Sequence, residues 1–242
     1  MHIRAAAAVL LAVLLQPVFA NADSVTRSAG SKNFEFAIPE GQCVLEDSNR
    51  ADASFSKVIA TLLKGAQNTL IVASAECSRR AALRRGEAQS ITDYAAYYTP
   101  DQFINTTVPG KTETLRKQLC ADMRKQGDAT LAGVEDIVAE KAKELRADIA
   151  VTSTKYVGVM AEDAHGCYAA LLIGVKGADG GALLMTSVVT STVSHGKPLF
   201  LAIYRPYEGP RTIKAAVADA KATMAEFDTL NGDSHLAPMD AR

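Results

Sequence analysis

Four segments between residues 150 and 206 have a hydrophobic period of two, and only short turns separate them. They read "VTSTKYVGVMAED", "CYAALLIGV", "LLMTSVVTSTVSH" and "PLFLAIYR", and they are joined by "AHG", "KGADGG" and "HGK". A period of two is typical of strands. Connections this short force neighbouring strands to run antiparallel. This half of the chain therefore predicts a four-stranded antiparallel meander.

The first half of the chain mixes helical and strand patterns. Strands are expected over 34–38, 68–77 and 91–99, and helices over 55–63, 78–85, 112–127, 134–145 and, after the meander, 212–230. The strand over 68–77 is apolar on both faces, so we expect it inside a sheet. The fold class predicted is α+β: an antiparallel sheet meander with helices packed on it, as in an α/β/α sandwich.

The domain organisation follows from composition along the chain. Residues 1–22 combine Arg4, an apolar run and small residues at Ala20 and Ala22, which is typical of a cleaved signal peptide. The polar residues 23–33 are expected to be disordered, 34–231 to form a single α+β domain, and 232–242 to be a disordered tail.

The charge balance restricts the class of partner. The chain has 26 Lys and Arg against 27 Asp and Glu, so its net charge is −1. A nucleic-acid-binding protein needs excess positive charge to contact phosphates. We therefore expect a protein or small-molecule partner, no nucleic acid, and no integral membrane segment after the signal peptide is removed.

An N-terminal strand and turn, a helix, a long antiparallel meander and a closing helix resemble the Mog1/PsbP-like sandwich superfamily. The residues that carry the resemblance are Phe34, Phe36, Ile38, Pro39 and Gly41, together with the ending "LFLAIYRPYEGP". The resemblance implies an accessory, assembly or binding protein, and it implies no shared catalytic residues.

The cysteines can be interpreted in two ways. Cys43, Cys77, Cys120 and Cys167 all follow the signal peptide. An even number of cysteines in an exported protein favours disulfides. Cys43 with Cys77 and Cys120 with Cys167 are the favoured pairs, although spacing alone does not determine connectivity.

The alternative is catalysis or metal binding by the same residues. Cys77 begins a basic helix, which would lower the pKa of its thiol, and His165 or His195 could act as its base. Glu162, Asp163, His165 and Cys167 lie close together in sequence and could hold zinc or copper. The cysteine spacings are wide, and no second group of ligands has a characteristic spacing. Both observations argue against a metal site, so we expect no cofactor and no metal.

The basic segment "SRRAALRR" is the candidate interaction surface. Arg79, Arg80, Arg84 and Arg85 could bind an acidic partner, although a run of charge is more often a solvated helix face. The sequence thus predicts an exported, soluble periplasmic protein of the bacterial envelope, with a binding or accessory role rather than a catalytic one.

Overall fold

The computed structural model describes residues 23–88, 90–130, 133–145, 150–176 and 181–232. The predicted signal peptide (1–22), part of the turn between the second and third meander strands (177–180) and residues 233–242 of the predicted tail lie outside the described residues.

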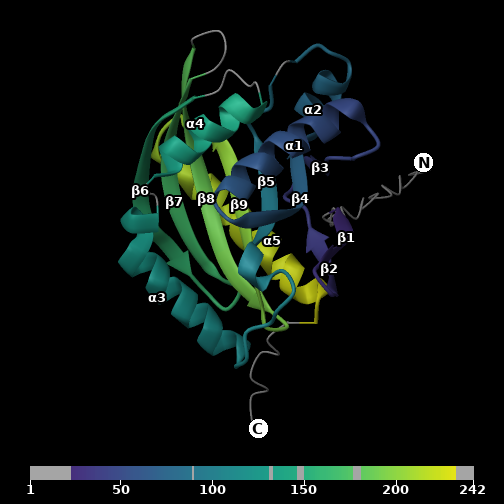
Figure 1. Ribbon diagram of the computed structural model, residues 1–242. Coiled ribbons are helices and arrows are strands. Elements are labelled where there is room, and N and C mark those ends of the chain that lie inside the picture. The colour runs from purple at the N-terminus through teal and green to yellow at the C-terminus, as the bar shows by residue number, and fades with distance from the viewer. Residues whose placement is uncertain (1–22, 89, 131–132, 146–149, 177–180, 233–242) are drawn as a thin grey trace, which may run out of the picture.

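A seven-stranded sheet forms the centre of the molecule, in the order β3-β4-β5-β9-β8-β7-β6 (Figure 1). Its strands are β3 (Gln42–Val44), β4 (Asn68–Glu76), β5 (Tyr94–Pro100), β6 (Ala150–Glu162), β7 (Cys167–Lys176), β8 (Ala182–Ser194) and β9 (Lys197–Pro206). Every neighbouring pair is antiparallel. The predicted meander, β6 to β9, is therefore confirmed.

Helices cover both faces of this sheet. They are α1 (Arg50–Gly65), α2 (Cys77–Arg84), α3 (Thr112–Thr130), α4 (Val134–Leu145) and α5 (Pro210–Leu230), with a short 3-10 helix, η1 (Asp101–Phe103), after β5. Figure 1 shows α1, α3 and α4 in front of the strands and α5 behind them. The predicted α+β class is confirmed, and the arrangement is helix, sheet, helix.

The expected disorder of residues 23–33 is wrong. β1 (Ser24–Ala29) pairs antiparallel with β2 (Lys32–Ala37), and Gly30 lies in the turn with φ of 65°. Four of the six β1 residues are exposed to solvent, which explains why the segment is polar, whereas β2 supplies the buried Phe34 and Phe36. A strand that is stabilised by pairing rather than by its own apolar residues gives a weak hydrophobic pattern.

Each face of the sheet has its own core. On the α5 side, Phe34 and Phe36 of β2 pack with Tyr97, Met224 and Phe227. On the α1 side a smaller cluster gathers Leu45, Ile59, Ala73, Ala75, Ile91 and Ala96. β5 supplies both, because alternate residues of a strand point to opposite faces.

The loop that follows β5 is fixed by a buried lysine. Lys197, at the start of β9, donates from Nζ to the carbonyl oxygens of Phe103, Ile104 and Thr106 at 2.7, 2.9 and 2.8 Å. Burial lowers the pKa of Lys197. The three carbonyls satisfy the ammonium, which would otherwise be costly to bury.

The two edges of the sheet differ. β6 is a long edge strand with three irregularities in its register against β7. At the other edge β3 is short and pairs only with residues 74–76 of β4. The prediction that residues 68–77 form an interior strand is therefore right for the second half of β4 and wrong for the first half.

We predict that Gly30→Ala destabilises the protein much more than Gly41→Ala. Both glycines have positive φ, 65° and 75°, which costs an alanine about 1 kcal/mol. A Cβ at Gly30 would lie 1.7 Å from the carbonyl oxygen of Ile104, whereas a Cβ at Gly41 meets nothing within 4 Å. Urea unfolding should show G30A losing at least about 2 kcal/mol more than G41A. Equal losses would mean that the contact with Ile104 relaxes freely.

Candidate functional site

The four cysteines form two disulfides. Cys43 of β3 is bonded to Cys77 at the start of α2, and Cys120 of α3 is bonded to Cys167 at the start of β7. These are the two pairs favoured from the sequence. Closing the 34-residue separation of the first pair stabilises the fold by about 4 kcal/mol in the chain-entropy model. Cys77 therefore offers no free thiol for the catalytic alternative.

The basic helix α2 is bound to the start of α1 by ion pairs. The fully buried carboxylate of Asp52 accepts from Arg80 Nε at 2.8 Å and from Arg84 Nη2 at 2.6 Å. Both arginines also contact Glu46. The predicted interaction surface therefore contains two cations that stabilise the packing of α2 on α1.

The other two arginines of the predicted interaction surface, Arg79 in α2 and Arg85 directly after it, are solvent-exposed. Arg85 pairs with Glu87 at 2.7 Å, and Arg79 has no ion pair among the described residues. That this helix binds a partner stays a prediction. Arg79 is the arginine most accessible to such a partner.

The Asp52 carboxyl has a lowered pKa. Burial opposes its ionisation, but hydrogen bonds from Arg84, from the backbone N–H of Glu46 and from Arg80 outweigh that cost. The N–H of Glu46 lies 2.9 Å from Asp52 Oδ2. Asp52 is therefore ionised in the folded protein and stabilises the α1–α2 corner through its charge.

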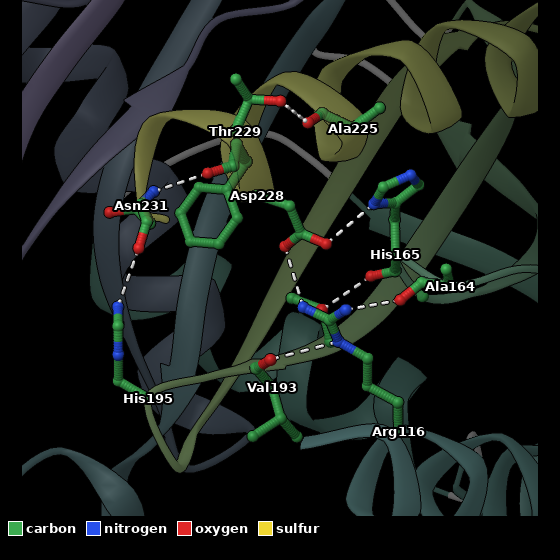
Figure 2. Close-up of polar contacts among 12 residues, drawn as sticks. Arg116, Ala164, His165, Val193, His195, Ala225, Asp228, Thr229 and Asn231 are labelled. Atoms are coloured by element: carbon green, nitrogen blue, oxygen red, sulfur yellow. Dashed lines mark hydrogen bonds and ion pairs between the residues drawn. The ribbon is translucent and has the colours of Figure 1, made fainter. Parts of the chain in front are cut away.

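A second buried carboxylate, Asp228, lies near the end of α5 between the side chains of Arg116 and His165 (Figure 2). Its Oδ1 accepts from Arg116 Nη2 of α3, and its Oδ2 contacts His165 Nδ1 in the β6–β7 turn, both at 2.8 Å. Arg116 also donates to the carbonyl oxygens of Val193 and Ala164. One guanidinium thus joins α3 to α5, to the β6–β7 turn and to the end of β8.

Burial raises the pKa of the Asp228 carboxyl, while the hydrogen bond from His165 and the charge of Arg116 act in the opposite direction. The His165 ring is 29% exposed, and Nδ1 is its only ring atom with a contact among the described residues. An imidazole oriented through Nδ1 presents Nε2 as a proton acceptor or ligand.

The other histidine of interest holds the same end of α5. In Figure 2, His195 of the β8–β9 turn points toward Asn231, whose backbone carbonyl accepts from Nε2 at 3.0 Å. The Asn231 side chain in turn bonds both backbone polar groups of Glu35 in β2. Both candidate histidines are therefore engaged in anchoring α5, and neither has a thiol beside it.

The residues considered as metal ligands in the alternative interpretation do not converge. Glu162 pairs with Arg124, and Cys167 is in a disulfide. Asp163 accepts from two backbone N–H groups and from Tyr168, and it also pairs with Lys221. Within the part of the chain that the structure describes, no group of three or more His, Cys, Asp or Glu side chains could hold a metal ion.

Sequence reasoning missed Arg116 and Asp228, although a signal was present. Arg116 lies one helical turn before Cys120 on the apolar face of α3, and Asp228 lies one turn after Met224 on that of α5. Charged residues are almost never fully buried unless they are paired. A charge on an apolar face therefore predicts a buried partner, but it does not identify that partner.

Residues 68–72 of β4 have no strand partner on the β3 side among the described residues, and this open part of the edge borders a groove. A cavity of about 310 Å³ lies between β1, α1 and this edge, and residues 70–73 of β4 line it. A second cavity of about 370 Å³ continues toward α4 and shares Lys57, Ala60 and Leu70 with the first. We call the two together the β4-edge groove. Lysines line it on the α1 and α4 sides, and the sequence patterns did not predict it.

No family model and no curated protein matches the sequence. Among solved structures, the chain is similar to cyanobacterial PsbP (CyanoP) from Synechocystis sp. PCC 6803, with 14% identity and a TM-score of 0.32. The match covers 89% of this chain and 94% of that one. This is a weak likeness at the level of fold, and membership of the superfamily predicted above stays a prediction.

Among the described residues, no helix is both long enough and apolar enough to cross a membrane. The two disulfides are typical of proteins that fold in an oxidising compartment.

We predict that Arg116→Met lowers the free energy of unfolding by about 3–5 kcal/mol, because it leaves Asp228 buried without its cation. Lys117→Met is the matched control: Lys117 is the next residue, and its pair with Glu113 is exposed on both sides. Urea unfolding at neutral pH should separate the two variants clearly. Similar losses in both would show that Asp228 does not depend on Arg116.

We also predict that the stabilisation from Asp52 is lost in acid. Because its folded-state pKa lies below the ordinary 3.8, the ionised carboxylate stabilises the fold above that value, and the effect disappears as pH falls through the folded-state pKa. Asp52→Asn should therefore cost about 2 kcal/mol between about pH 5 and 7, and the difference from wild type should narrow below about pH 4. A difference that stays constant down to about pH 2 would contradict this.

Proposed function

We propose that this chain is an exported periplasmic protein of the bacterial envelope that binds or assists a partner without catalysing a reaction. The observation that carries the proposal is the β4-edge groove, a hollow along a sheet edge that no other described strand covers. Unpaired strand edges and concave apolar surfaces are typical sites of association.

Two further observations support export. Residues 1–22 have the charge, apolar run and small residues of a signal peptide. Both disulfides join distant elements, β3 to α2 and α3 to β7, as expected of a protein that folds where thiols are oxidised.

The polar clusters support a binding role more than a catalytic one. Asp52, Asp228 and Lys197 are buried, and each contacts groups that come from other elements of the fold. Such side chains hold helices and loops in place. The thiol-enzyme alternative needs a free Cys77 and is not proposed.

The proposal predicts a partner at the groove in the periplasm. We would express the full chain in a Gram-negative host with a photo-crosslinking phenylalanine in place of Ser56, which lines the groove, and irradiate living cells. The matched control carries the same residue in place of Lys214, which is exposed on α5. We expect a mature chain that begins at Asn21 or Asp23 in the periplasmic fraction, and a discrete adduct from position 56 but not from position 214. Recovery in the cytoplasm would contradict export, and identical adducts from both positions would contradict binding at the groove.

A further inference from the structure

We propose that the β4-edge groove binds an extended, acidic peptide segment of a partner protein, which adds to the sheet as a strand beside β4. This inference rests on the proposed function and specifies the chemistry of the partner. The argument uses the backbone of the edge, the shape of the groove and its charges.

The backbone of β4 is open where the groove lies. β3 ends at Val44, and the next residue, Leu45, donates its N–H to the carbonyl oxygen of Ala73 at 2.9 Å. Before Ala73, β4 has a strand partner among the described residues only on its β5 side. The outward N–H and C=O groups of residues 68–72 are therefore available to a strand that continues the line of β3.

The groove has room for such a strand. Five open residues of β4 correspond to about 17 Å of edge, at roughly 3.4 Å per residue. The two cavities follow this edge and share the Lys57, Ala60 and Leu70 lining. On α1 the wall includes the small side chains of Ala53, Ser56 and Ala60. Small residues leave space between the helix and the edge.

The lining offers apolar contacts on both sides of an added strand. Leu70 packs with the core on the α1 side, whereas Ile71 packs with the core on the α5 side, and both are half-buried. Adjacent residues of a strand face opposite sides of the sheet, so these two neighbours contact opposite cores. Since side chains of a strand alternate between faces, apolar residues of the peptide would meet this surface on either side.

The charges of the groove select a peptide with carboxylates. Lys57 on the α1 wall and Arg27 on the β1 wall are exposed and have no ion pair among the described residues. Lys64 and Lys141 add positive charge further along, although they pair with Asp101 and Glu144. Asp47 is the carboxylate nearest the β3 end. A cation on each wall can meet a carboxylate from either face of the added strand.

The same charges argue against a second copy of this chain as the occupant. Two β4 edges that paired with each other would bring two cationic linings together, and like charges at an interface are costly. An acidic segment from another protein avoids this repulsion.

Selection from a displayed library of random octapeptides, followed by synthesis of an enriched sequence, tests the inference with purified oxidised protein. We expect enriched peptides to alternate apolar residues with Asp or Glu. Their binding should bring hydrogen-exchange protection to those backbone amides of residues 68–72 that face the open edge. N-methylation of alternate peptide bonds should abolish binding, because it removes the donors that a β-strand needs.

Matched variants locate the binding. Lys57→Glu should weaken the selected peptide about tenfold, and Lys214→Glu, the same charge change on α5, should leave affinity unchanged. Enrichment of basic or proline-rich peptides, full binding of the N-methylated peptide, or equal effects of the two variants would overturn the inference. So would a dimer of the protein alone, seen by sedimentation and dissociated by K57E, because the occupant would then be a second copy.

The two proposals fail separately. A crosslinked partner at position 56 in cells, combined with no enrichment of acidic extended peptides, would refute this inference and leave the binding role standing. Enrichment and protection within residues 68–72 without an adduct in cells would refute the proposed function in the envelope and leave the peptide site in place.

Discussion

The antiparallel pairing of β5 with β9 is the contact on which the rest of the structure depends. It joins the three strands from the first half of the chain to the meander, over a sequence separation that is expensive to close. Aromatic pairs stabilise it at both ends: Tyr94 stacks on Tyr204 with ring centroids 4.5 Å apart, and Tyr98 stacks on Phe200 at 5.3 Å. Without this pairing the two cores would lose the sheet that separates and supports them.

The sequence predicts what depends on local periodicity. The meander and the main helices were recognised because their patterns repeat every 2 or 3.6 residues. β1 was missed because its inward residues are only the half-buried Val25 and the small Ala29, and the pairing with β2 holds the strand in place. The open edge of β4 was missed because its residues are apolar on both faces. They pack under α1 and the β1–β2 hairpin, which gives the same pattern as burial by neighbouring strands.

The polar sites show the same limit. Four cysteines after a predicted signal peptide favour disulfides, and the fold then determines which cysteines pair. Asp228 and Arg116 are 112 residues apart, and no spacing rule connects them. The basic character of α2 was visible in the sequence, but two of its arginines pair with Asp52, a residue of α1 that no sequence pattern distinguishes. Ion pairs between residues that are distant in sequence can be identified only once the three-dimensional structure is known.

The irregular register of β6 has a consequence for assembly. A sheet that accepts a strand at one edge can grow into a filament only if its opposite edge can accept the next molecule. Three irregularities interrupt the regular spacing of donors and acceptors along β6, whereas β4 has one, between Leu70 and Val72. A straight incoming strand therefore finds fewer consecutive partners at β6 than at β4, and a guest at β4 is less readily followed by a second molecule at the opposite edge than in a sheet with two regular edges.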